Sequence, residues 1–211
     1  MKNIYIHIGT HRTGSTSLQA CLFDYQRLLL REDIKFDDMS YELGKDLLLC
    51  DKPVPTGEPL GLVTGVLYKK SFQKEIFDKA LWSSEGFFGN PFWGYSNIKY
   101  IVDYLKYITE GINTTIIVFI RKRDDFIRSL YHVYKINGNA DNLEDFTKHM
   151  NRFEFNWDEL VGEYKSRFSD VQVFPYEGTD VLNTVFEVIG SKHRCNSNNY
   201  RLNVSNRYLN G

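Results

Sequence analysis

The feature that most constrains this fold is an apolar run, a glycine-bounded loop and a helical segment that follow one another directly. Apolar residues alternate with others over residues 4–8 and the run stops at Gly9, which indicates a short strand that feeds a tight turn. A helical pattern then covers residues 15–30, and Ser15 or Thr16 is expected to cap its first turn with a hydroxyl. The sequence therefore predicts a strand, a loop and a helix in succession.

The rest of the sequence continues to alternate strand and helix patterns. Strands are expected over 80–82, 114–120 and 171–174, and helices over 71–79, 97–110, 124–136, 142–149, 157–168 and 181–189. The run over 114–120 lacks polar alternation, which is typical of a strand covered on both faces. Because helices separate the strands and no hairpin signal intervenes, the pattern predicts an α/β fold of three layers, with helices on both sides of a central parallel sheet.

Chain length favours one domain. The 211 residues, of which 42% are hydrophobic, can bury one substantial core but are few for two. We therefore expect a single domain over residues 1–211. Residues 31–70 include three closely spaced prolines and show no clear period, so they are expected to form an irregular insertion or cover whose apolar residues still need burial.

Charge, cysteines and apolar runs exclude several classes of protein. The 26 basic and 27 acidic residues nearly cancel, so the sequence lacks the positive field that nucleic-acid binders use. Cys21, Cys50 and Cys195 are odd in number and widely spaced, which fits neither a disulfide framework nor a paired metal site and favours a reducing cytoplasm. No apolar run reaches the length of a membrane span. We expect a cytoplasmic protein without a nucleic-acid partner, and nothing indicates its oligomeric state.

The segment from Gly9 to Ser17 has the spacing of a phosphate-binding loop. Gly14 lies five residues after the first glycine, and Ser15 stands where nucleotide-hydrolysing families place lysine. Glycines let backbone amides approach a phosphate, and the helix N-terminus behind the loop adds positive potential. An ordinary glycine turn is the alternative interpretation. The cation Arg12, two residues before the second glycine, argues against that alternative.

A second basic motif lies where the expected strand over 114–120 ends. Arg121 closes that strand, and Ser129 follows eight positions later on the next expected helix. Because that helix doubles back over the edge of the sheet, both side chains can converge on one anion, and arginine matches a phosphate bidentately. A solvated basic turn is the alternative for this motif alone. Ligands of parallel sheets bind beyond the carboxyl ends of the strands, so the two motifs are expected to share one site.

The two motifs together resemble the sulfotransferase superfamily that uses 3′-phosphoadenosine 5′-phosphosulfate, and in particular its bacterial, carbohydrate-type members. The resemblance lies in the loop string from Ile6 to Gln19 and in the pairing of Arg121 with Ser129. It implies a P-loop-like fold, 3′-phosphoadenosine 5′-phosphosulfate as the co-substrate, and a saccharide as the acceptor. The loop residues that would hold the 5′-phosphosulfate are consecutive: His11, Arg12, Thr13, Gly14, Ser15, Thr16 and Ser17.

The resemblance also implies roles for individual residues. Arg12 stands in the slot usually held by lysine, where it keeps the charge but changes the donor geometry, and it would stabilise the bridging oxygen as the sulfuryl group leaves. Arg121 and Ser129 would hold the 3′-phosphate. A C-terminal segment that often closes over the nucleotide in this family would supply Arg201, Asn203 and Ser205.

Glu85 is the expected catalytic base. It follows an apolar strand and completes a Ser-Ser-Glu string similar to one in carbohydrate sulfotransferases, where glutamate takes the acceptor proton. A helix cap or a surface ion pair is the alternative for a lone carboxylate. His11 and His7 are rival bases, although His7 belongs to a strand interior and is expected to pack in the core. The aromatic residues over 86–95 could line the acceptor site or, as is more common, fill the core.

Two other functions remain open from the sequence. The expected sulfuryl transfer is an in-line displacement that backbone amides and Arg12 could support without a metal ion. A P-loop kinase or nucleotide hydrolase with a degenerate Walker A loop would instead need a lysine near Ser15 and an acidic metal partner, and the sequence shows neither convincingly. A nucleotide-binding module without catalysis is the third hypothesis. Arg12 in the lysine slot keeps it open, and intact Glu85 and Arg121 argue against it.

Overall fold

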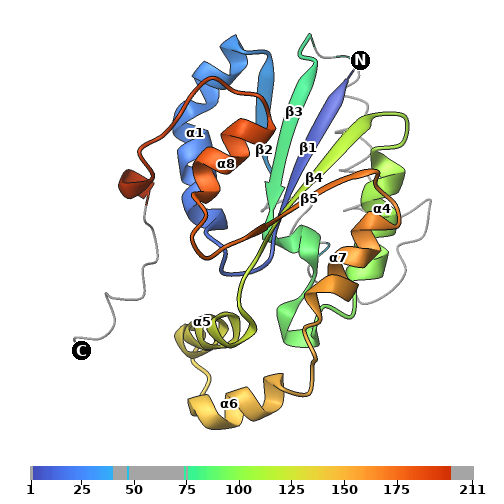
Figure 1. Cartoon of the computed structure of the whole chain (residues 1–211). Helices are drawn as coiled ribbons and strands as arrows, with labels where there is room; N and C mark the ends of the chain where they lie inside the picture. Colours follow the sequence, from blue (N-terminus) through green and yellow to red (C-terminus); the bar gives the residue numbers. More distant parts are fainter. Residues whose placement is uncertain (1, 40–46, 48–73, 75, 201–211) are drawn as a thin grey trace.

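A parallel sheet of five strands forms the centre of the protein (Figure 1). The computed structural model describes residues 2–39, 47, 74 and 76–200. Its strands lie in the order β2-β3-β1-β4-β5 and all neighbouring pairs are parallel. Their bounds are β1 (Asn3–Gly9), β2 (Ile34–Asp38), β3 (Lys79–Ser84), β4 (Asn113–Ile120) and β5 (Asp170–Pro175).

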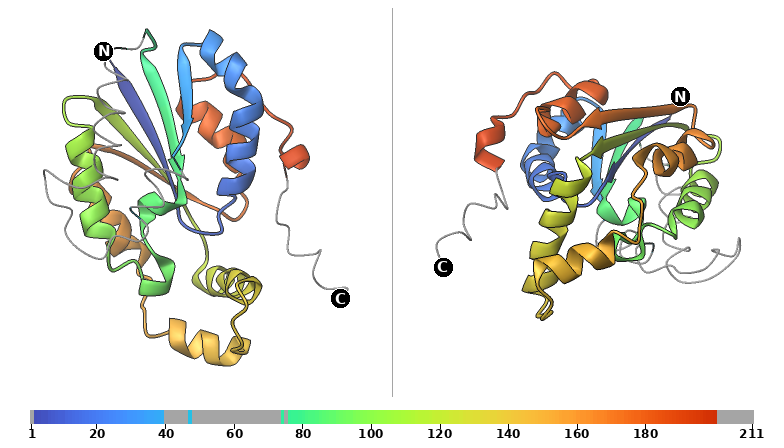
Figure 2. Two further views of the ribbon diagram at one scale, coloured as in Figure 1. Left: turned by 180° about the vertical axis from the view of Figure 1, so that it is seen from behind. Right: turned by 60° about the horizontal axis from the view of Figure 1, so that its bottom comes forward.

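Helices cover both faces of the sheet. On one face α1 (Ser15–Arg31) packs beside α8 (Val181–Val188), and on the other α4 (Ile98–Ile108) packs beside α7 (Trp157–Lys165). Figure 2 shows the same division from behind and from below. The core follows this division, because Ile116 and Val118 of β4 join one hydrophobic cluster while Ile117 and Phe119 join the other. The predicted three-layer α/β fold of P-loop-like type is confirmed.

The carboxyl ends of the strands carry the segments that can form a site. Two 3-10 helices, η2 (Glu85–Phe88) and η3 (Pro91–Trp93), follow β3 directly. Helices α5 (Arg123–Ile136) and α6 (Leu143–Met150) follow β4 and lie beyond the end of the sheet (Figure 1). In the sheet, β2 and β3 lie on one side of β1, and β4 and β5 lie on its other side. In open α/β sheets, ligands bind at the carboxyl ends of strands where the strand order reverses in this way.

Two expectations from the sequence are corrected. Residues 34–38 form the edge strand β2, although the region 31–70 was expected to be irregular, because Ile34 pairs with Lys79 and the next residues continue the ladder. The helix expected over 71–79 does not extend to residue 79, because Lys79 already belongs to β3. Most of the rest of 40–75 lies outside the described residues.

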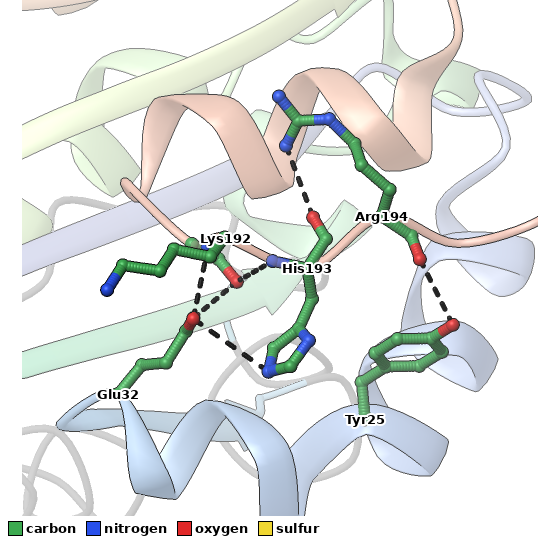
Figure 3. A network of polar contacts seen from close by, with 6 residues as sticks. Tyr25, Glu32, Lys192, His193 and Arg194 are labelled. Atoms are coloured by element: carbon green, nitrogen blue, oxygen red, sulfur yellow. Dashed lines mark hydrogen bonds and ion pairs between the residues drawn. The ribbon is translucent and has the colours of Figure 1, made fainter.

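The segment after α8 is held against the far end of α1 by polar contacts (Figure 3). The Glu32 carboxylate accepts hydrogen bonds from the Ser191 hydroxyl at 2.5 Å and from the Lys192 amide at 3.1 Å. These bonds hold the pKa of Glu32 below its usual value, although burial alone would raise it. The Tyr25 hydroxyl donates to the Arg194 carbonyl at 3.2 Å. The short helix η4 (Ser197–Tyr200) follows. Within the part of the chain that the structure describes, no helix is both long and apolar enough to cross a membrane.

Candidate nucleotide-binding and catalytic site

The loop after β1 is held in one conformation by its own hydroxyl groups. The Thr10 hydroxyl donates to the Phe119 carbonyl of β4 at 2.6 Å, and the Thr13 hydroxyl donates to the Thr10 carbonyl at 2.5 Å. Arg12 and Gly14 both adopt left-handed backbone conformations, with φ of 70° and 81°. Left-handed residues in such a turn aim successive amides to one side, which is how a loop forms an anion-binding concavity. The loop therefore has the backbone shape that phosphate binding requires.

The start of the loop packs closely against the first turn of α1. A Cβ at Gly9 would overlap the Ser15 hydroxyl in its present rotamer, so glycine permits this close approach. The hydroxyl expected to cap α1 does not do so, since the N-cap is Gly14 and makes no side-chain capping bond. Among the described residues, the buried Ser15 oxygen has no hydrogen-bond partner. Buried hydroxyls are normally paired, so this one is available to a ligand at the helix N-terminus.

Arg12, Ser129 and Arg121 meet across the carboxyl end of the sheet. Arg12 Nε donates to the Ser129 hydroxyl of α5 at 2.8 Å. Arg121 Nη1 donates to the Arg12 carbonyl at 2.9 Å. Along the chain, Arg12 is 109 residues from Arg121 and 117 residues from Ser129. The two motifs thus form one cluster. Ser129 was expected to face an anion together with Arg121, and its oxygen accepts from Arg12 Nε in this structure.

Tyr176 and Glu177 complete the surroundings of Arg121, and the sequence reasoning assigned them no role. The Arg121 guanidinium lies over the Tyr176 ring, 5.2 Å from its centre, and a side chain built at Gly14 would come within 3.6 Å of the same ring. Glu177 lies 3.9 Å from Arg121 Nε and accepts the Lys122 amide at 3.1 Å. Both residues follow the end of β5. The rule that ligands bind beyond the carboxyl ends of parallel strands could have identified them.

Glu85, His11 and Tyr95 form a second cluster beside the loop. Glu85 follows β3 directly, and its Cγ lies 3.4 Å from where a Gly9 side chain would begin. The Tyr95 hydroxyl lies 3.4 Å from His11 Nδ1. Burial lowers the pKa of His11, Glu85 raises it in part, and Arg12 lowers it further. Burial also raises the pKa of Tyr95 well above its usual value. The histidine is therefore neutral at pH 7 and the phenol keeps its proton.

The contact between His11 and Tyr95 fits either tautomer of the histidine. A protonated phenol donates through its hydrogen or accepts at its oxygen, and in a neutral imidazole one nitrogen donates while the other accepts. The contact therefore engages Nδ1 of His11. Glu85 lies close to both residues and raises the pKa of each in part.

His7 is a core residue, as its strand position indicated. Its ring is fully buried, and burial lowers its pKa to about 4. Nδ1 lies 2.9 Å from the Ser83 hydroxyl, while Nε2 has no hydrogen-bond partner in the described part of the chain. The ring packs beside Phe119, with 5.9 Å between ring centres. His7 lies beneath the loop and not at its surface.

The structure describes some of the remaining candidate residues, and three others lie outside the described residues. Phe87, Phe88 and Tyr95 are buried in the core, whereas Trp93 is exposed. Thr16 is exposed on α1 and Ser17 is buried. Three candidate residues at the C-terminal end lie outside the described residues, so their expected contact with the nucleotide stays a prediction: Arg201, Asn203 and Ser205.

The chain has distant structural similarity to known proteins. No protein family and no curated protein matches the sequence. Among solved structures, mouse sulfotransferase SULT7A1 complexed with PAP has a TM-score of 0.48 at 13% identity, over 92% of this chain and 61% of that one. Kti12 of Chaetomium thermophilum in complex with ADP-AlF3 has a TM-score of 0.42 at 10% identity, over 88% of this chain and 98% of that one. The chain thus spans less than two thirds of the mouse sulfotransferase, and similarities of this size do not bear on activity.

Proposed function

We propose that this protein is a sulfotransferase that moves a sulfuryl group from 3′-phosphoadenosine 5′-phosphosulfate to a hydroxyl or amine of an acceptor, with a saccharide as the expected acceptor. The observation that carries the proposal is the cluster of Arg12, Ser129 and Arg121, in which hydrogen bonds of 2.8 and 2.9 Å join the two motifs. Two cations held at the ends of neighbouring strands suit a ligand with two separate phosphate groups. A nucleoside 3′,5′-bisphosphate has that charge distribution.

The residues present fit such a co-substrate. The loop amides and the unpaired Ser15 hydroxyl would receive the 5′-phosphate end. Arg121 would face the 3′-phosphate with the donors that the Arg12 carbonyl does not use, and the Ser129 hydroxyl still has its own proton to donate. Arg12 gives one of its five N–H groups to Ser129, and the others can face the oxygen that bridges phosphorus and sulfur.

The transfer step follows from these positions. Glu85 accepts the proton of the acceptor hydroxyl while the acceptor oxygen forms a bond to sulfur. The bond between sulfur and the bridging oxygen breaks, and its electron pair leaves with adenosine 3′,5′-bisphosphate. Arg12 balances the charge that develops on that oxygen, which is the kind of electrostatic stabilisation that contributes most to such reactions. No metal ion is needed for this balance.

Glu85 is the proposed base, because either oxygen of a carboxylate can take a proton, whereas Nδ1 of His11 already contacts the Tyr95 hydroxyl. The Glu85 side chain lies beside Gly9, with Cγ 3.4 Å from where a side chain there would begin. His11, whose pKa burial lowers, is the rival base.

A magnesium-dependent P-loop enzyme is the second candidate, and the position of Glu85 is what favours it. P-loop kinases and hydrolases place a metal-binding carboxylate near the phosphate loop, together with a serine or threonine hydroxyl. Ser15 in place of the loop lysine opposes this reading, because that lysine normally contacts the phosphates.

Thermal stability with added ligands separates the two candidates. A ligand raises the melting temperature of the fold that binds it. We expect adenosine 3′,5′-bisphosphate to stabilise the protein in the presence of EDTA. Stabilisation by magnesium–ATP alone would contradict the sulfotransferase proposal, as would a failure to transfer ³⁵S from labelled donor to any member of a saccharide panel when the bisphosphate does bind.

A further inference from the structure

A hollow of about 420 Å³ lies between η3, α5 and α6, apart from the phosphate loop. Its volume is in the range of small-molecule binding sites. Tyr134 follows Ser129 by five residues on α5, a rise of about 7.5 Å along the helix. Phe92 lies in the segment that begins at Glu85. The hollow therefore shares two segments of the chain with the candidate site but none of its residues.

Three aromatic rings form the floor of the hollow. The rings of Phe92 and Tyr134 lie 6.3 Å apart between centres, and those of Tyr134 and Phe146 lie 4.8 Å apart. All three line the hollow. Phe146 is buried, while Phe92 and Tyr134 are half-buried and keep part of their surface open. Phe92 and Tyr134 thus supply the open apolar surface of the floor, and Phe146 packs against Tyr134.

Polar side chains form the rim. Asn137, Asn139 and Asp141 come from the connection between α5 and α6, and His149 comes from α6. Amide and carboxylate groups offer paired donors and acceptors at fixed spacing. Asp141 is the one acidic side chain of the rim, and its two asparagine amides suit a ligand rich in hydroxyl groups.

The rim is held in place by hydrogen bonds to α5. The Tyr134 hydroxyl donates to the Asp141 carboxylate at 2.6 Å, and the Tyr131 hydroxyl donates to the Asp141 carbonyl at 3.2 Å. The Asn139 amide donates to the Tyr134 carbonyl at 2.9 Å. Asp141 and Asn139 are held in this way and need little ordering when a ligand binds, which lowers the entropic cost of binding.

We propose that this hollow binds a saccharide ring and holds the acceptor of the proposed transfer. A sugar ring has one face of C–H groups that can lie on the aromatic floor, and hydroxyls at its edge that can pair with the amides and carboxylate of the rim. The part of the proposal that calls this saccharide an acceptor rests on the proposed function. The binding of the sugar does not.

Saturation-transfer NMR on the full chain tests the proposal, with cellobiose, lactose and N,N′-diacetylchitobiose as probes. At least one disaccharide should bind the native protein. Asn137→Ala and His149→Ala should each weaken that binding about fivefold, the effect of one lost hydrogen bond. Both side chains are exposed, so neither change should unfold the protein. His132→Ala is the matched control, because His132 is exposed on α5 and does not line the hollow.

The outcomes for the hollow and for the proposed function are distinguishable. Absence of binding by all three disaccharides, or equal binding by the native protein and both rim variants, overturns the hollow as a sugar site. Stabilisation by adenosine 3′,5′-bisphosphate in the same samples leaves the proposed function standing in that case. Sugar binding that the rim variants weaken, without any bisphosphate stabilisation, supports the hollow and contradicts the proposed function.

Discussion

Replacing Arg121 by alanine should weaken the binding of adenosine 3′,5′-bisphosphate far more than the binding of adenosine 5′-monophosphate. The guanidinium is held in place by the Arg12 carbonyl at 2.9 Å and by the Tyr176 ring at 5.2 Å, so it is prepared to meet an anion. Hydrogen bonds to a charged group contribute about 1.5–3 kcal/mol. The loss of that contribution corresponds to about a 10- to 150-fold higher Kd for the bisphosphate.

The monophosphate supplies the control within the experiment. It lacks the 3′-phosphate, so its Kd should change much less in Arg121→Ala when both ligands are measured by isothermal titration calorimetry. Arg123→Ala is the control variant, because the Arg123 guanidinium bonds to Asn151 at 2.9 Å. Its affinity for both ligands should match that of the native protein. An unchanged bisphosphate affinity in Arg121→Ala, or an equal loss for both ligands, would refute the assignment of Arg121 to the 3′-phosphate.

Three further predictions follow from the loop and its neighbours. Glu85→Gln should bind the bisphosphate normally and lose turnover by about 10²- to 10⁴-fold, the range for general bases, and full activity in a ³⁵S transfer assay would reject Glu85 as the base. Gly9→Ala should displace the Ser15 hydroxyl and reduce the thermal shift caused by the bisphosphate. An unchanged shift would mean that the Ser15 hydroxyl does not contact the nucleotide. Burial lowers the pKa of His7 to about 4, so the unfolded chain binds the extra proton first and stability should fall by about 2 kcal/mol from this residue between pH 7 and pH 5. Urea unfolding at the two pH values measures the fall, and a native His7 pKa near 6.5 by NMR would contradict the prediction.

The sequence predicted the central strands and most helices because their patterns are long and regular. The apolar runs of β1 and β4 are buried on both faces, and no other element type explains them as well. The edge strand β2 was missed because it is short and its last residues are Asp37 and Asp38. Charged residues are common on edge strands, where one side of the ladder lies open, and their pattern resembles that of a loop.

Within the candidate site, the sequence could predict which motifs converge but not the contacts between them. The carboxyl-end rule correctly brought the loop and Arg121 to the same edge of the sheet. The left-handed backbone at Arg12 and the bond from Arg12 to Ser129 are features that no residue pattern indicates. The hydroxyl of Ser15 was expected to cap α1, but Gly14 at the N-cap leaves it facing Gly9.

Contacts between distant segments account for the rest of what was missed. Tyr95 meets His11 across 84 residues of sequence, and only the folded chain shows that a buried phenol lies beside the histidine. The hollow draws its lining from η3, α5, α6 and the connection between α5 and α6, and these aromatic and amide residues carry no common motif. Such sites depend on packing angles between helices, which a single sequence does not specify.

The most direct test of the central claim is a crystal structure of the protein with adenosine 3′,5′-bisphosphate. The account predicts one nucleotide across the carboxyl ends of β1 and β4, with the 5′-phosphate at the amides of Gly14 and Ser15 and the 3′-phosphate at Arg121 and Ser129. A nucleotide bound elsewhere, or one whose 3′-phosphate points into solvent away from Arg121, would contradict it.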